Sequence, residues 1–127
     1  MRHLSLLLIS LSLLFTSCES HKSPTETVRA YLAATNSFDF QTAEKLIIPN
    51  KENLHTLENL KISGEKMSEN EKRRFFNQEK DCIYYEKEIT DSVAQLIVTP
   101  NQDIVLPIEF NLKKVNGNWL IESVISH

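Results

Sequence analysis

Residues 103–125, DIVLPIEFNLKKVNGNWLIESVI, decide the fold that the sequence predicts. Apolar residues stand at every second position of 104–112, and a period of two gathers them on one face of a β-strand. Asn116 and Gly117 follow, a dipeptide that suits the positive φ angles of a two-residue hairpin turn. Trp119 then begins a returning strand. We therefore expect a long antiparallel hairpin with one apolar face, which the rest of the chain has to cover.

The first half of the domain is predicted to be helical. Ser-Pro-Thr-Glu at 23–26 is typical of a helix start, because serine can cap, proline suits the first turn and glutamate completes a capping box. Asp39 is expected to cap a second, shorter helix. That helix should end at Pro49, since the residue before a proline is pushed out of the helical region.

A third helix is predicted over residues 50–60, where leucines recur at helical spacing. Ser63 and Gly64 are expected to break this pattern. A second capping box at 68–71 opens a segment rich in charged residues, which we expect to form a solvated face.

Two more strands are predicted between these helices and the hairpin. Residues 82–89 are rich in aromatic and β-branched side chains, with Ile83, Tyr85 and Ile89 on one face, and residues 93–99 form the next strand. Helices come first and four strands follow, an order typical of the α+β class. We expect amino-terminal helices packed on a curved four-stranded antiparallel meander.

Residues 1–17 are predicted to be a secretory signal peptide. They contain a short basic start, an apolar run over 4–15 and small residues immediately before Cys18. The apolar run is shorter than the roughly 20 residues that a membrane-spanning helix needs.

The sequence Phe-Thr-Ser-Cys at 15–18 resembles the bacterial lipobox, with Phe15 where that signal usually has leucine. The resemblance implies cleavage before Cys18 and a lipid on the new amino terminus. Residues 18–22 would then be the lipidated cysteine and a polar tether, and 23–127 a single α+β domain. The resemblance also implies a place in the bacterial cell envelope, anchored to a membrane, with the outer membrane expected. The alternative is an ordinary secretory signal with an incidental cysteine.

The second cysteine and the net charge limit the possible partners. If Cys18 carries a lipid, Cys82 is unpaired and is expected to be a small buried apolar side chain, because a reactive thiol needs a nearby base or helix start. The formal net charge is −3, and no lysine- or arginine-rich face is evident. This balance argues against a nucleic-acid partner and against charge-driven binding to anionic lipid. Membrane contact is therefore expected through the lipid alone.

The order of these segments resembles the nuclear transport factor 2-like (cystatin-like, cone-shaped) superfamily, and within it small bacterial lipoprotein domains of unknown function. The resemblance implies a curved sheet wrapping the first helix, with a pocket at the open end. Superfamily members include isomerases, dehydratases and non-catalytic binding or dimerising domains, so the fold alone does not give the function. The segments that carry the resemblance are 23–32, 38–46, 91–98 and 115–121.

An isomerase of this fold would need a carboxylate base and a hydrogen-bond donor in one apolar pocket. Each candidate has a structural explanation, so we predict no catalytic residues, no metal site and no cofactor; His55 is expected to be a solvated helical residue. The candidate donors are Tyr31, Tyr84 and Tyr85, and the candidate bases are Asp39, Asp81, Glu86 and Glu109. The residues expected to line the pocket are Tyr31, Tyr85, Phe110 and Trp119.

Three functions remain open from the sequence. The first is non-catalytic binding of a protein partner or a small apolar ligand by a lipid-anchored envelope protein. The second is an isomerase- or dehydratase-like enzyme that uses the cone pocket. The third is a structural homodimer formed sheet to sheet, in which Val105, Leu120 and Val124 could contribute to an outer apolar patch.

Overall fold

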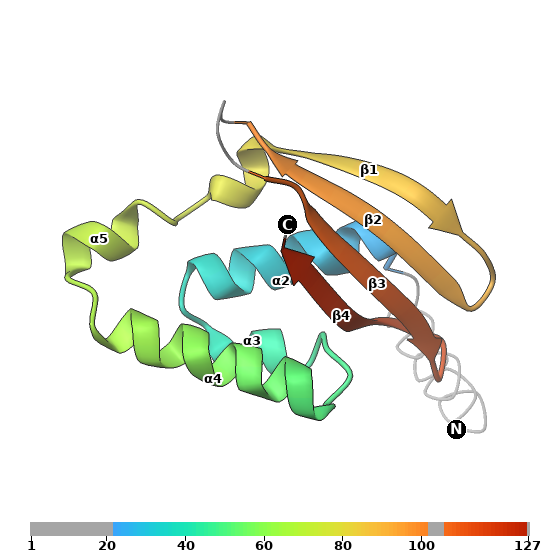
Figure 1. Ribbon diagram of the computed structural model, residues 1–127, viewed down its shortest axis with the longest axis horizontal. Helices are drawn as coiled ribbons and strands as arrows, with labels where there is room; N and C mark the ends of the chain where they lie inside the picture. Colours follow the sequence, from blue (N-terminus) through green and yellow to red (C-terminus); the bar gives the residue numbers. More distant parts are fainter. Residues whose placement is uncertain (1–21, 102–105, 127) are drawn as a thin grey trace, which may run out of the picture.

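The computed structural model describes residues 22–101 and 106–126. Four strands form one antiparallel sheet in the order β1-β2-β3-β4, which confirms the predicted α+β class and four-stranded meander (Figure 1). The elements in chain order are α2 (Pro24–Asn36), α3 (Phe40–Glu44), α4 (Lys51–Glu65), α5 (Glu69–Arg73), the 3₁₀ helix η1 (Gln78–Asp81), β1 (Cys82–Ile89), β2 (Val93–Pro100), β3 (Ile108–Val115) and β4 (Asn118–Ser126).

The helices occupy one side of the sheet. Helix α2 packs directly against it, α3 and α4 lie beyond α2 next to β4, and α5 lies farthest from the strands (Figure 1). Within residues 22–101 and 106–126, no helix combines the length and apolar character needed to cross a membrane.

Helix α2 begins with the predicted Ser23 cap but without the predicted capping box, because the Glu26 carboxylate accepts from the Ser23 hydroxyl, at 3.3 Å, instead of from its backbone N–H. The Ser23 side chain accepts a hydrogen bond from the Glu26 backbone N–H at 3.1 Å, and Pro24 occupies the first turn. The helix turns Thr27, Val28 and Tyr31 towards the sheet.

The core lies between α2 and the inner face of the sheet. The ring of Tyr31 meets that of Phe110 edge to face, with centroids 6.1 Å apart. Burying each large apolar side chain stabilises the fold by about 1.5–3 kcal/mol, so this layer is the main source of stability. The largest fully buried side chains are Phe110, Leu96, Leu112, Ile121, Val28, Val98 and Thr27.

The β3–β4 hairpin turns at the predicted dipeptide. Asn116 and Gly117 take φ angles of 52° and 82°, and Val115 pairs with Asn118 across the turn. The prediction of a two-residue turn with positive φ angles is confirmed.

The start of the third strand was predicted too early. Strand β3 begins at Ile108, and Leu106, expected on the inner face, is 61% exposed. Pro107 explains the difference, because it has no backbone N–H for the sheet and constrains the residue before it. Ile104 of the predicted strand lies outside the described residues.

The inward face of β1 is the opposite of the expected one. Ile83 and Tyr85 are each 62% exposed, while Cys82 and Tyr84 pack against the core. The pairing explains this, because Tyr84 lies opposite Val98 of β2 and directly paired residues share a face. Val98 is fully buried, so Tyr84 also faces inward.

Helix α3 ends earlier than predicted. Asp39 caps it as expected, but its last residue is Glu44 rather than one next to Pro49. The chain after it pairs with the edge of β4 instead: Ile48 N–H donates to the Ile121 carbonyl at 2.8 Å, and Ile121 N–H donates to the Leu46 carbonyl at 2.9 Å. These bonds cover one edge of the sheet.

Helix α4 runs through the predicted break. It continues past Ser63 and Gly64 to Glu65, and Gly64 is buried inside it. A Cβ at Gly64 would lie 2.7 Å from Cδ1 of Phe38. The glycine therefore permits close packing of the Phe38 ring on α4 rather than ending the helix.

Two asparagines fix the start of α4 to an irregularity in β4. The register of β3 and β4 shifts between Asn111 and Leu112, which leaves Glu122 as an extra residue. The Glu122 carbonyl accepts hydrogen bonds from the side chains of Asn50 and Asn53, each at 3.0 Å. The Asn53 amide also donates to the carbonyls of Ile48 at 2.9 Å and Ile121 at 3.1 Å.

We expect Asn53→Ala to lower the free energy of unfolding by about 1–3 kcal/mol, because the carbonyls of Ile48, Ile121 and Glu122 each lose one of their two donors. Urea denaturation of the full chain measures the change. The matched control is His55→Ala, on the exposed side of the same helix, which should change stability by less than about 0.5 kcal/mol. Equal midpoints for the two variants would contradict the anchoring role of Asn53.

Candidate ligand-binding groove

A groove of about 550 Å³ lies between α3 and α4. This volume falls in the range of roughly 300–1,000 Å³ that is usual for small-ligand sites. Apolar side chains from both helices and from the preceding turn meet charged side chains in its lining. The lining residues are Phe38, Asp39, Phe40, Gln41, Glu44, Leu54, Leu57, Glu58 and Lys61.

Phe38 forms one end of the groove and takes an unusual backbone conformation. Its φ angle is 61°, a region that costs a non-glycine residue about 1 kcal/mol or more. Aromatic contacts hold the ring there: its centroid lies 6.3 Å from that of Phe40, 6.0 Å from Phe75 and 6.5 Å from Phe76. The Phe38 ring is thus shared by the groove and by an aromatic cluster that includes Phe75 and Phe76.

Helix α4 contributes apolar side chains that the fold leaves partly open. Leu57 is buried, but Leu54 in the groove is 40% exposed, and Leu60 and Ile62 are 39% and 41% exposed. Leu60 lines a smaller cavity of about 120 Å³ that shares Phe38 and Phe40 with the groove. The apolar surface is therefore continuous from one cavity to the next.

The rim of the groove carries an excess of negative charge. Three carboxylates, Asp39, Glu44 and Glu58, stand against one ammonium group, Lys61, and all four side chains are exposed. The hydroxyl of Thr42, at 2.6 Å, and its backbone N–H, at 3.2 Å, donate to Asp39 and lower the pKa of that carboxyl. Asp39 is therefore ionised at neutral pH.

A second cavity of about 360 Å³ lies at one end of the sheet, between α2, η1 and β1. Beside it, the buried Glu79 accepts a hydrogen bond from the Asn36 side chain at 3.0 Å, and the Tyr84 hydroxyl donates to the Glu79 carbonyl at 2.6 Å. The lining residues are Leu32, Asn36, Gln78, Asp81, Cys82, Val98, Pro100, Asn101 and Ile108.

The chemistry of Cys82 in this cavity does not favour a nucleophile. Burial, followed by the nearby charges of Glu79 and Asp81, raises the pKa of the thiol. A cysteine is reactive as the thiolate, which these surroundings disfavour. The Sγ atom lies 3.4 Å from the Gln78 carbonyl as a weak donor.

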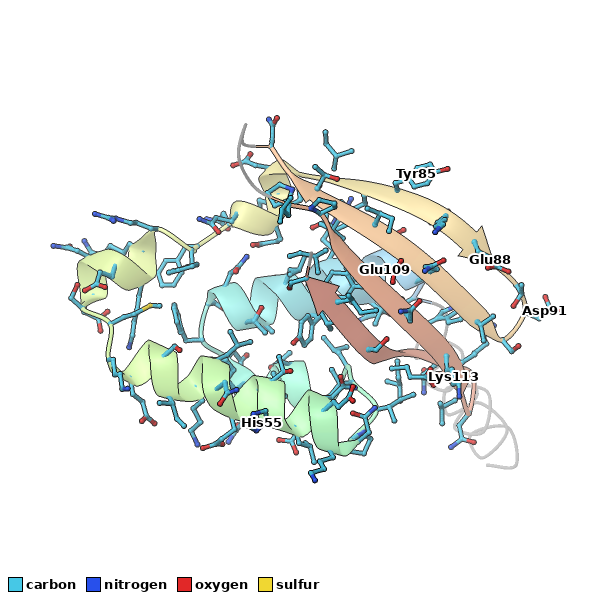
Figure 2. The ribbon with its side chains drawn as sticks, in the orientation of Figure 1. His55, Tyr85, Glu88, Asp91, Glu109 and Lys113 are labelled. Atoms are coloured by element: carbon cyan, nitrogen blue, oxygen red, sulfur yellow. The ribbon has the colours of Figure 1, made fainter. Side chains whose placement is uncertain are left out.

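The four side chains predicted to line one pocket are distributed differently. Tyr31 and Phe110 belong to the core under α2, and burial raises the pKa of Tyr31. Trp119 is 8% exposed, with Lys114 Nζ 5.4 Å from its ring centroid. Tyr85 projects from β1 on the face of the sheet away from the helices (Figure 2).

The four candidate bases lie at different places in the fold and do not share a site. Asp39 caps α3, and Asp81 is exposed at the sheet-end cavity. Glu86 accepts a hydrogen bond from the Thr25 hydroxyl at 2.7 Å, and Glu109 accepts one from the Gln95 side chain at 2.7 Å. No tyrosine lines either of the two cavities into which Asp39 and Asp81 open.

The histidine considered for metal binding is exposed. Figure 2 shows His55 on the side of α4 away from the sheet. Among residues 22–101 and 106–126, no three histidine, cysteine, aspartate or glutamate side chains are grouped so that they could hold a metal ion.

The sequence interpretation did not identify the α3–α4 groove. The leucines of α4 repeat at helical spacing and predicted a helix, but the spacing does not show that Leu57 is buried while Leu54 and Leu60 are exposed. Phe38 gave no signal, because neither its positive φ angle nor its packing on Gly64 is evident from neighbouring residues.

We expect Cys82 to react with iodoacetamide severalfold more slowly in the folded chain than in the urea-unfolded chain at pH 7, because its raised pKa keeps the thiol protonated. The rate in the folded chain should rise as the pH increases above the usual thiol range. Mass spectrometry of the peptide that contains Cys82 measures both rates. A faster reaction in the folded chain at pH 7 would reveal an activated thiolate and contradict this account.

Comparison of the chain with protein-family models, with curated proteins and with solved structures gave no match. The likeness to the nuclear transport factor 2-like superfamily therefore remains a prediction that depends on the order of the segments in the sequence.

Proposed function

We propose that the chain is a lipid-anchored protein of the bacterial cell envelope whose domain binds a ligand or a protein partner without catalysis. The anchor follows from the signal-like residues 1–17, the lipobox-like 15–18 and the polar tether at 18–22. The observation that carries the binding role is the α3–α4 groove, which combines an open apolar floor with an ionised rim. A few placed polar groups around an apolar surface are the usual composition of a binding site.

The alternative of an isomerase- or dehydratase-like enzyme has less support. Such an enzyme needs a base and a hydrogen-bond donor that converge on one substrate. In the α3–α4 groove the carboxylates are exposed, and no tyrosine hydroxyl stands opposite them. At the sheet-end cavity the nearby Tyr84 hydroxyl is engaged by the Glu79 carbonyl. The geometry favours recognition over acid–base chemistry.

The alternative of a sheet-to-sheet homodimer is favoured by one observation. Ile83, Tyr85 and Ile125 are 62%, 62% and 41% exposed on the outer face of the sheet. Of the residues predicted to contribute to such a patch, Leu120 is half-buried and Val105 lies outside the described residues. The prediction for Val124 is wrong, because it pairs with the fully buried Phe110 and packs against the core on the inner face. Polar pairs interrupt this face, since the Asn111 side chain donates to the Ser123 hydroxyl at 3.0 Å.

The anchor is tested by labelling the chain with a radioactive fatty acid in a bacterial host. We expect the unmodified chain to incorporate the label and to sediment with the membrane fraction, because the lipid is its attachment. Cys18→Ala should lose both properties completely. Cys82→Ala is the matched control and should keep both. Equal labelling of the Cys18→Ala variant and the unmodified chain would refute the lipid anchor.

A further inference from the structure

We infer that the α3–α4 groove binds a basic peptide segment, whose apolar side chains enter the groove while its cations meet the carboxylates of the rim. This inference deepens the proposed binding function and rests on it. It commits to one class of occupant, a protein segment in which lysine or arginine alternates with large apolar residues.

The apolar floor of the groove is the reason to expect apolar side chains in the peptide. Phe38, Phe40 and Leu54 remain partly accessible there, although the same chain buries other large apolar side chains completely. The adjoining cavity of about 120 Å³ extends this surface to Leu60 and Phe75. An apolar surface divided between two adjoining cavities suits successive side chains of a peptide better than one compact ligand.

The carboxylates of the rim are the reason to expect basic side chains in the peptide. Neither of the described ion pairs, Lys72–Glu69 and Lys113–Glu122, includes a rim carboxylate, so those carboxylates have no cation within 4.0 Å among the described residues. Lys72 is a further cation near the lining, with its Nζ 5.5 Å from the centroid of the Phe38 ring. Asp39 is held ionised by its hydrogen bonds with Thr42. Because these carboxylates are exposed, water and salt screen them, and each should attract a cation modestly.

The distribution of the carboxylates favours several cations rather than one. Asp39 and Glu44 bracket α3, whereas Glu58 stands on the opposite wall, on α4. A single small cation could not meet all three positions, but a segment with spaced basic residues could do so. The same charges repel phosphates, anionic lipid headgroups and nucleic acids, which excludes these as occupants.

Removing the charge of Lys61 should change the affinity for basic and acidic peptides in opposite directions, which can be tested. Lys61 is the one cationic residue in the lining, on the same helix as Glu58. A basic peptide would be repelled by Lys61, so removing that charge should strengthen its binding, whereas an acidic peptide would lose a favourable charge.

Isothermal titration of the purified full chain in non-ionic detergent provides the test. The probes are three hexapeptides, LKLKLK, LSLSLS and LELELE, which share their leucines and differ in charge. We expect LKLKLK to bind most tightly and LELELE most weakly. The double variant Glu44→Lys/Glu58→Lys should weaken LKLKLK binding about tenfold, since each exposed charge pair contributes a factor of roughly two to five.

Further variants test the apolar contacts and the charge contacts one at a time and control for nonspecific effects. Leu54→Ala should weaken binding of all three peptides, and Lys61→Gln should strengthen binding of LKLKLK alone. The matched control for charge is Glu65→Lys, which lies on α4 outside the groove lining and should leave the affinity unchanged. Urea denaturation of each variant identifies any loss of binding that comes from unfolding.

The results that would overturn the inference differ from those that would overturn the proposed function. Equal affinity for LKLKLK and LELELE, equal weakening by Glu65→Lys and the double variant, or no binding of any of the three peptides would each refute a basic occupant. Binding of LSLSLS alone, abolished by Leu54→Ala, would do the same while leaving a binding role for the groove. The proposed membrane anchor is judged separately, by the labelling of Cys18.

Discussion

The side-chain amide of Asn53 holds the start of helix α4 against strand β4. Its nitrogen donates to carbonyls of Ile48, Ile121 and Glu122, which belong to the segment before α4 and to β4. An extra residue in a strand leaves backbone groups without partners in the sheet, and leaving them buried and unpaired would be costly. Asn50 and Asn53 supply the missing donors, and in doing so they fix the start of α4 against β4.

The position of α4 then determines where the molecule can bind. The Tyr31–Phe110 layer fills much of the space between α2 and the inner face of the sheet. Space remains at one end of the sheet, in the cavity of about 360 Å³ that α2, η1 and the strands line. Helix α4, held at its first turn and packed through Gly64 on the Phe38 ring, leaves a groove against α3. The groove therefore places accessible apolar surface on the helical side of the domain, apart from the cavity at the end of the sheet.

The sequence predicted those features that depend on local chemistry. The Asn116-Gly117 turn, the Ser23 and Asp39 caps and the order of helices before strands follow from neighbouring residues. Features that depend on distant contacts were missed. The alternation in β1 offered two plausible faces, and pairing with buried Val98 selected the one that contains Tyr84.

The groove was missed for the same physical reason. A glycine in a helical pattern looks like a stop, and only the packing of Phe38 explains why α4 continues through Gly64. Likewise, leucines at helical spacing predict a buried face, but they do not reveal how much of that face another element covers. The candidate site therefore required the three-dimensional arrangement of α3 and α4.

The most direct test of the central claim, that the α3–α4 groove is the binding site, is the detection of intermolecular nuclear Overhauser effects by NMR. The measurement uses the full chain with a peptide of alternating leucine and lysine. The account predicts contacts between the peptide leucine methyl groups and the ring protons of Phe38 and Phe40, which line the groove. Contacts found instead with Tyr85 and Ile83, on the outer face of the sheet, would contradict it.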